Sequence, residues 1–192
     1  MLDRPGSQPF GVLVVCTGNL HRSPLAERLL AVRLAPASER VHVSSAGTAA
    51  LTGAPMDPAA ASLLSEMGGD PGGAVARRLT SGLVSDAALV LGAASEHREA
   101  AVRLCPVHGL RSAFTLREFA RLLRGEDAAG LTDPAERAAA LTAGAAARRG
   151  LTGPGSSDDD LVDPYGASEQ EARACAARIT EAVQRIAAAV LG

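Results

Sequence analysis

A short stretch near the N-terminus, residues 12–24, places the tightest constraint on how this chain can fold. Residues 12–15 are four consecutive apolar side chains and predict a buried strand. Pro24 suits the first position of a helix, where a backbone N–H would have no partner in any case. Residues 16–23 must therefore form a tight loop that leads from the end of a strand into a helix.

The loop combines one thiol, one guanidinium and a run of backbone amides at a helix N-terminus. Such amides can point inward and bind a phosphate-like anion. Gly18 permits close approach of the backbone, and Asn19 tolerates the left-handed conformation that a tight curl needs. The planar fork of Arg22 can hold two anion oxygens. The predicted phosphate-binding residues are Thr17, Gly18, Asn19, Leu20, His21 and Arg22.

Cys16 is interpreted as a nucleophile at the base of this anion cradle. A helix N-terminus and a nearby cation favour the thiolate, which is the reactive form. Ser23 can donate a hydrogen bond to the sulfur and help it leave in a second step. The alternative is a structural cysteine followed by an ordinary loop, but the pattern Cys-x5-Arg-Ser-Pro at a strand end favours catalysis.

The alternation of strands and helices along the 192 residues predicts one α/β domain. We expect a small doubly wound sheet of four parallel strands with helices on both faces, a three-layer α/β/α fold whose ligand site lies at the carboxyl ends of the strands. The strands are predicted at residues 10–15, 41–45, 87–91 and 110–114. The helices are predicted at residues 24–34, 57–67, 95–104, 115–124, 133–149 and 168–191.

Residues 125–160 are expected to be an inserted helix followed by an acidic linker, within a single domain that spans residues 1–192. This stretch has few large apolar side chains, so it predicts a lid or a surface appendage that adds little core. Its acidic run, residues 158–160, is expected to be solvated. His97 and Arg98 on an earlier helix are likewise expected to lie on a solvated face.

Composition restricts the compartment and the partners. The net charge of −2 offers no basic field for nucleic acid or a membrane surface, and no apolar stretch is long enough to span a bilayer. Three widely spaced cysteines do not form a disulfide framework, and a reactive thiol needs a reducing compartment. We therefore expect a cytoplasmic protein without cofactor or metal. The oligomeric state stays open.

Residues 16–24 resemble the signature loop of the low-molecular-weight protein tyrosine phosphatases. The resemblance continues in residues 45–48, 76–80 and 163–165, and so spans most of the chain apart from a long stretch before Asp163. Several cysteine phosphatases share the loop, but in those it lies far into the chain. An N-terminal loop paired with a late Asp-Pro-Tyr is more specific to this family.

The resemblance implies a phosphomonoester hydrolase with a cysteinyl-phosphate intermediate. Cys16 would attack phosphorus, Arg22 would hold the phosphate, and Asp163 would act as general acid and then base. Asp-Pro also opens ordinary turns, but beside the signature loop and Tyr165 it is interpreted as catalytic. In the related phosphatases, the serine that matches Ser45 supports the loop by a hydrogen bond to the asparagine that matches Asn19, and the resemblance implies the same role for Ser45.

Three departures from the family pattern bear on the substrate. His21 stands where a second cysteine is usual, so a protective disulfide with the nucleophile is not expected, and whether His21 adds positive charge or points away is left open. Leu51 replaces a pocket aromatic, which leaves Tyr165, the only tyrosine, as the ring available to stack on a phenyl group. The usual supporting histidine is missing or replaced at residues 73–75.

A phosphotyrosine protein is thus the expected substrate, and a small phosphorylated metabolite is the alternative. Two further classes share parts of the pattern. An arsenate reductase needs two more cysteines that relay a disulfide, for which Cys105 and Cys175 do not look suitably placed. A non-catalytic phosphate-binding module would retain Arg22 but would not need Cys16 and Asp163 beside it.

Overall fold

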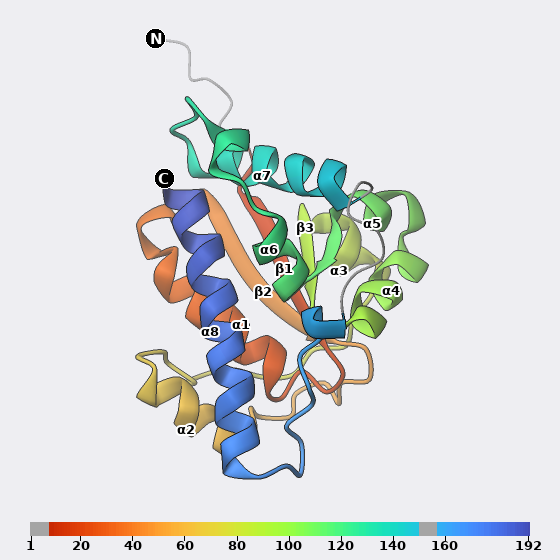
Figure 1. The fold of residues 1–192 in the computed structure, drawn as a ribbon. Coiled ribbons are helices and arrows are strands. Elements are labelled where there is room, and N and C mark those ends of the chain that lie inside the picture. Colours follow the sequence, from red (N-terminus) through yellow and green to blue (C-terminus); the bar gives the residue numbers. More distant parts are fainter. Residues whose placement is uncertain (1–7, 150–156) are drawn as a thin grey trace.

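The computed structural model describes residues 8–149 and 157–192, which form four parallel strands surrounded by helices (Figure 1). The strands are β1 (Phe10–Cys16), β2 (Val41–Gly47), β3 (Leu89–Gly92) and β4 (Ala113–Thr115). Their order in the sheet is β2-β1-β3-β4, so β2 lies on one side of β1, and β3 and β4 lie on the other. The predicted doubly wound α/β/α fold is confirmed.

The central strand β1 is buried on both of its faces. Its side chains alternate between two cores, because successive residues of a strand point to opposite sides of the sheet. Val12, Val14 and Cys16 join the larger core, and Leu13 and Val15 join the smaller one. This explains why the strand is an unbroken apolar run rather than an alternating one.

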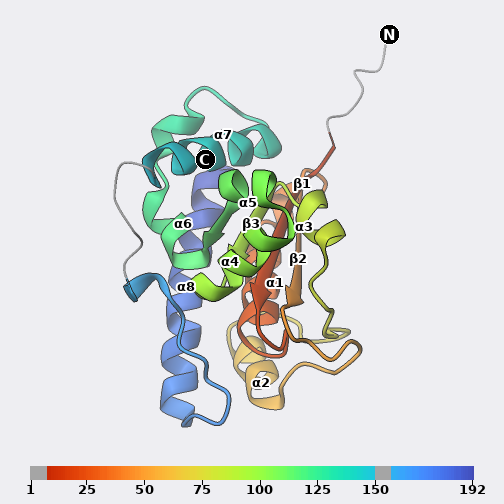
Figure 2. The same ribbon diagram turned by 90° about the vertical axis from the view of Figure 1, so that its right-hand side faces the viewer.

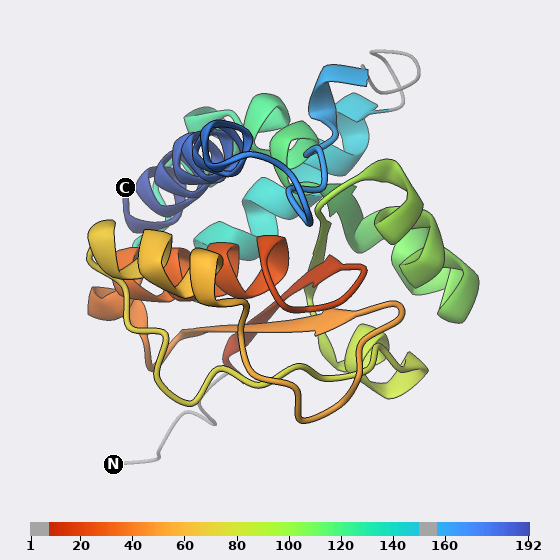
Figure 3. The same cartoon turned by 90° about the horizontal axis from the view of Figure 1, so that it is seen from below.

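Helices cover both faces of the sheet (Figures 2 and 3). The larger core contains residues of α1 (Arg22–Arg33), α2 (Pro58–Glu66), α6 (Leu116–Leu122), α7 (Pro134–Arg149) and α8 (Glu169–Leu191). The smaller core contains residues of α3 (Ser81–Asp86) and α4 (Ser95–Leu104). The remaining helix, α5 (Pro106–Ser112), packs on α4, and short 3-10 turns occur at Ala35–Ala37, Gly125–Ala128 and Ser157–Asp159.

The predicted fourth strand is present, but it starts later than the predicted residues 110–114, because residues 110–112 are the end of α5. Pro106 starts α5, and only Ala113–Thr115 pairs with the sheet. Gly109 explains why a helix fits here: a Cβ at this position would lie 2.8 Å from the Cα of Val102, so only a glycine lets α5 approach α4 this closely. The short helix α3, which Thr80 caps, was not predicted.

The prediction that residues 125–160 add little core is also wrong. Ala135, Ala138, Leu141 and Ala145 of α7 are buried in the larger core. Alanines supply this packing because their small side chains let the helix lie close to its neighbours. The part of the predicted linker at residues 150–156 lies outside the described residues.

The acidic run at residues 158–160 is not uniformly solvated, contrary to the prediction. Asp159 is 5% exposed and forms an ion pair with Arg121 at 2.7 Å. Asp160 accepts hydrogen bonds from the backbone and hydroxyl of Ser95, each at 2.8 Å. These contacts tie the segment that leads to Asp163 to the start of α4 and to α6.

Candidate active site

The loop formed by residues 16–22 lies at the carboxyl end of β1 and leads directly into α1. It therefore occupies the switch point of the sheet, between β2 on one side and β3 on the other. Asn19 has a φ of 56°, the one positive φ of a non-glycine residue in the described part of the chain. The chain curls here as the sequence predicted, and an asparagine tolerates that conformation.

Cys16 lies buried at the base of the loop, 2% exposed. Its Sγ atom accepts a hydrogen bond from the backbone N–H of Asn19 at 3.2 Å and lies 2.9 Å from the Oγ atom of Ser23. Both contacts come from groups able to donate to a sulfur anion. A thiolate at this position is thus stabilised by hydrogen bonds as well as by the helix N-terminus.

Asn19 links the loop to the neighbouring strand. Its side-chain amide donates to Ser23 Oγ at 2.9 Å and to Ser45 Oγ at 2.8 Å, so the hydrogen bond expected for Ser45 is present. Its Oδ1 atom accepts from the backbone N–H of Arg77 at 2.8 Å, and the Arg77 guanidinium donates to the carbonyl of Ser45. Ser45 also hydrogen-bonds Glu27. Arg77 therefore braces the loop, although the sequence contained no signal for this role.

Arg22 is only 4% exposed and faces groups from distant parts of the chain. Nη1 donates to the carbonyl of Leu161 at 3.1 Å, and Nη2 donates to Asp163 Oδ2 at 2.5 Å and to Thr17 Oγ1 at 3.4 Å. Asp163 is half-exposed and also accepts from the backbone N–H of Tyr165 at 3.2 Å. The fold thus brings Asp163 to Arg22 across 141 positions of sequence.

The family described as low molecular weight phosphotyrosine protein phosphatase matches residues 11–143. The chain belongs to this family. The segment that carries Asp163 lies beyond the matched residues, so its placement beside Arg22 comes from the tertiary structure.

Two bacterial proteins are among the curated relatives of this chain. The probable low molecular weight protein-tyrosine-phosphatase EpsP of Ralstonia nicotianae is 45% identical over 80 residues, which are 42% of this chain and 52% of that protein. The low molecular weight protein-tyrosine-phosphatase Etp of Escherichia coli K12 is 39% identical over 95 residues, 50% of this chain and 62% of that protein. The chain thus matches about half to three fifths of the length of these relatives.

Solved structures of the low molecular weight phosphatase fold match nearly the whole chain. The YwlE arginine phosphatase of Geobacillus stearothermophilus has a TM-score of 0.68 at 26% identity, over 94% of this chain and 92% of that one. Vibrio vulnificus Wzb in complex with benzylphosphonate has a TM-score of 0.66 at 26% identity, over 93% of this chain and 97% of that one.

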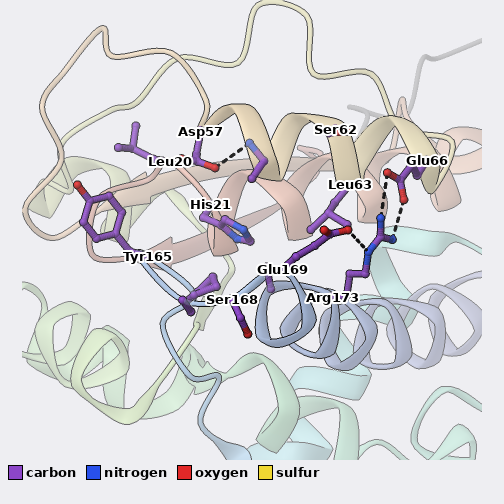
Figure 4. Close-up of a pocket in the computed structure, with 15 residues that line it drawn as sticks. Leu20, His21, Asp57, Ser62, Leu63, Glu66, Tyr165, Ser168, Glu169 and Arg173 are labelled. Atoms are coloured by element: carbon purple, nitrogen blue, oxygen red, sulfur yellow. Dashed lines mark hydrogen bonds and ion pairs between the residues drawn. The ribbon is translucent and has the colours of Figure 1, made fainter.

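A pocket of about 620 Å³ adjoins the 16–22 loop (Figure 4). Leu20, His21 and Tyr165 border it near the loop, and α2 and the start of α8 form its walls. Tyr165 is 84% exposed, so one face of its ring is free to stack. Leu51 is 78% exposed on the loop after β2 and lies outside this pocket.

The pKa of His21 lies below its ordinary value, which favours the neutral ring at neutral pH. Burial lowers the pKa of His21, and Arg22 acts in the same direction, while Asp57 and Asp163 oppose them. Neither ring nitrogen has a hydrogen-bond partner among the described residues. The ring therefore borders the pocket as a neutral group.

The other two cysteines lie outside the 16–22 loop. Cys175 is buried on α8, and burial raises the pKa of its thiol to about 11. Cys105 lies between α4 and α5 and contacts the carbonyl of Ser81. In the described part of the chain, all three cysteines are free, and no group of three or more metal-ligating side chains is present. The same residues include no helix long and apolar enough to cross a bilayer.

His97 was expected on a solvated face, and this is wrong. It is 1% exposed, and its Nε2 atom lies 2.9 Å from Thr17 Oγ1 in the 16–22 loop. Sequence pattern could not reveal this, because the contact joins the start of α4 to a loop 80 positions earlier.

Proposed function

We propose that this protein hydrolyses phosphomonoesters and acts as a protein-tyrosine phosphatase through a cysteinyl-phosphate intermediate. One observation carries the proposal: a buried cysteine sulfur that accepts an amide hydrogen bond lies in the same short loop as an arginine paired with a half-exposed aspartate. These residues are Cys16, Arg22 and Asp163. A phosphate-binding module without catalysis has no use for the thiol and the aspartate together.

In the first step, the Cys16 thiolate forms a bond to phosphorus and the ester P–O bond breaks. The amides of the 16–22 loop and Arg22 hold the phosphate oxygens in line for this displacement. The incoming phosphate competes with Asp163 for Arg22, since both are anions that bind one guanidinium. Asp163, released from Arg22 as a carboxylate, takes up a proton from solvent and gives it to the leaving oxygen.

In the second step, water replaces the sulfur. Asp163, now a carboxylate, takes a proton from the water, whose oxygen bonds to phosphorus while the S–P bond breaks. The Cys16 thiolate is regenerated and receives the hydrogen bonds from Asn19 and Ser23 that lower its energy as a leaving group. Asp163 ends the cycle protonated and inorganic phosphate departs.

The same chemistry argues against the arsenate reductase alternative. Arsenate reduction requires several thiols that attack one after another to relay a disulfide. A thiol attacks in its thiolate form. The raised pKa of Cys175 keeps its thiol protonated at neutral pH. The Cys105 thiol donates a hydrogen bond to the carbonyl of Ser81. The thiol of Cys16 must stay reduced to react, and the cytoplasm is a reducing compartment, so this chemistry supports action in the cytoplasm.

The proposed substrate is a phosphotyrosine side chain of a protein. Tyr165 borders the pocket beside Leu20, so an aryl group bonded to the phosphate can lie against an aromatic ring and an aliphatic side chain. The expected place of Leu51 in the substrate pocket stays a prediction. A small phosphorylated metabolite is the alternative substrate, because the described pocket has a single aromatic side chain.

The test compares turnover of phosphotyrosine peptides, phosphoserine peptides, phosphoarginine and a panel of phosphorylated sugars and nucleotides. We expect hydrolysis of an aryl phosphate and of phosphotyrosine peptides, and none of either after Cys16→Ser. Faster turnover of a small phosphate ester than of every peptide favours the metabolite alternative. Full activity of Cys16→Ser overturns the mechanism.

A further inference from the structure

His97 joins the 16–22 loop to the start of α4 through both ring nitrogens. Nδ1 lies 3.0 Å from the backbone nitrogen of Ala94, and Nε2 lies 2.9 Å from Thr17 Oγ1. A third polar atom, Glu96 Oε1, lies 3.4 Å from Nε2. A buried imidazole with partners on both nitrogens has a defined tautomer, which these partners determine.

The backbone N–H of Ala94 can only donate, so Nδ1 of His97 must accept. In the neutral ring the hydrogen then lies on Nε2, which donates it to Thr17 Oγ1. Burial and Arg22 lower the pKa of His97, whereas Glu96, Asp160 and Asp163 act in the opposite direction. The ring therefore stays neutral at pH 7, consistent with this tautomer.

Thr17 receives two donors on one oxygen. His97 Nε2–H occupies one lone pair and Arg22 Nη2 approaches the other at 3.4 Å. A hydroxyl has two lone pairs and one hydrogen, so the Thr17 hydrogen must go to a further acceptor. The loop of which Thr17 is part is the proposed phosphate site, and a bound phosphate offers such an acceptor.

We infer that His97 is a positioning residue, which orients the Thr17 hydroxyl as a donor toward phosphate and as an acceptor for Arg22. The inference rests on the proposed function for the identity of the anion. The inference assigns a neutral charge state to His97 and a fixed direction to the Thr17 hydroxyl, which would otherwise rotate between donor and acceptor arrangements. His97 itself touches neither the phosphate nor the sulfur in this role.

Two substitutions separate the two nitrogens of the ring. His97→Asn retains an acceptor near the Nδ1 position and loses the donor to Thr17, whereas His97→Gln retains a donor near Nε2 and loses the acceptor for Ala94. We expect His97→Asn to weaken binding of inorganic phosphate about fivefold and to lower kcat/KM for an aryl phosphate about tenfold. We expect His97→Gln to lose less than threefold in both but to unfold at a lower temperature.

Coupling to Thr17 is the decisive measurement. In a Thr17→Val background, His97→Asn should change phosphate affinity by less than twofold, because the hydroxyl it orients is gone. His42→Asn is the matched control, since His42 is exposed on β2 and should alter nothing. Equal losses of phosphate affinity in His97→Asn and His97→Gln overturn the inference. It is also overturned if the fold-losses of affinity in His97→Asn and Thr17→Val multiply in the double variant.

Phosphate affinity, measured by calorimetry, keeps this test separate from that of the proposed function. If the protein binds phosphate but hydrolyses no phosphate ester, the proposed function fails and the His97 inference is still judged by the affinities. If the protein binds no phosphate at all, both fail.

Discussion

Gly47 offers a direct test of how closely β2 supports the 16–22 loop. A Cβ on this residue would lie 2.5 Å from the carbonyl oxygen of Thr17 and 2.8 Å from the backbone nitrogen of Asn19. Neither atom can rotate away, because both belong to the backbone. The Thr17 carbonyl also accepts from Ala49 N–H at 2.9 Å, and Gly47 itself is hydrogen-bonded on both sides, to Arg77 and Leu79.

The expected size of the effect follows from these distances. A real Cβ stays at least 3.0 Å from such atoms, so Gly47→Ala must displace the loop by about 0.5 Å or more. Overpacking of this kind costs about 1–3 kcal/mol in the free energy of unfolding. Misplacement of reacting groups by about 1 Å can cost about a hundredfold in rate. We therefore expect kcat/KM to fall between about tenfold and a hundredfold while the protein remains folded.

The assay measures kcat/KM for an aryl phosphate together with urea unfolding. Gly82→Ala is the matched control: it lies in α3, and the nearest atom to an added Cβ is Thr80 Oγ1 at 3.8 Å. The control should be as active as the parent and as stable or slightly more so, because alanine favours a helix. Undiminished kcat/KM in folded Gly47→Ala would refute the argument that this contact shapes the loop.

Three further predictions concern the acid, the histidines and α7. Asp163→Ala should slow hydrolysis most for esters with poor leaving groups, since these need the proton most; an equal slowing across a leaving-group series, measured by initial rates, contradicts the assignment. The folded state lowers the pKa of His21 and His97 below the unfolded value of 6.5. The free energy of unfolding should therefore be fully retained above pH 6.5 and decrease as the pH falls below 6.5, and the decrease should be smaller in His97→Asn. Identical pH profiles of the parent and His97→Asn in urea titrations speak against this. Leu141→Ala should cost about 2–5 kcal/mol in the free energy of unfolding, against less than about 0.5 for the exposed Leu110→Ala, and a small loss at Leu141 would restore the view of α7 as an appendage.

Local patterns predicted most of the helices and strands because caps, turns and periodicity act over a few residues. The helix predicted over residues 95–104 is α4 with the same bounds, and the helices predicted from residues 115 and 168 begin directly after the capping side chains of Thr115 and Ser168. The errors arose where packing overrode the local pattern. Residues 106–112 became a helix because Gly109 lets α5 approach α4, a fact of tertiary contact.

Burial was hardest to predict for residues that are polar or small. His97 and Asp159 look like surface residues by type, and each is buried because a distant partner satisfies it, Thr17 in one case and Arg121 in the other. The alanines of α7 look too small to form core, yet together with Leu141 they cover one end of the larger core. In each case the deciding neighbour is remote in sequence.

The sequence by itself determined the loop and the residues in it that are proposed to react. Cys16, Arg22 and Ser23 are within eight positions of each other, so a strand end and a helix start suffice to gather them around one anion. Only the tertiary structure decided what surrounds that loop, because three distant segments reach it: Arg77 comes before β3, His97 follows β3, and Asp163 follows β4. A parallel sheet brings such distant residues together at the carboxyl ends of its strands, and no local pattern specifies which of them will meet.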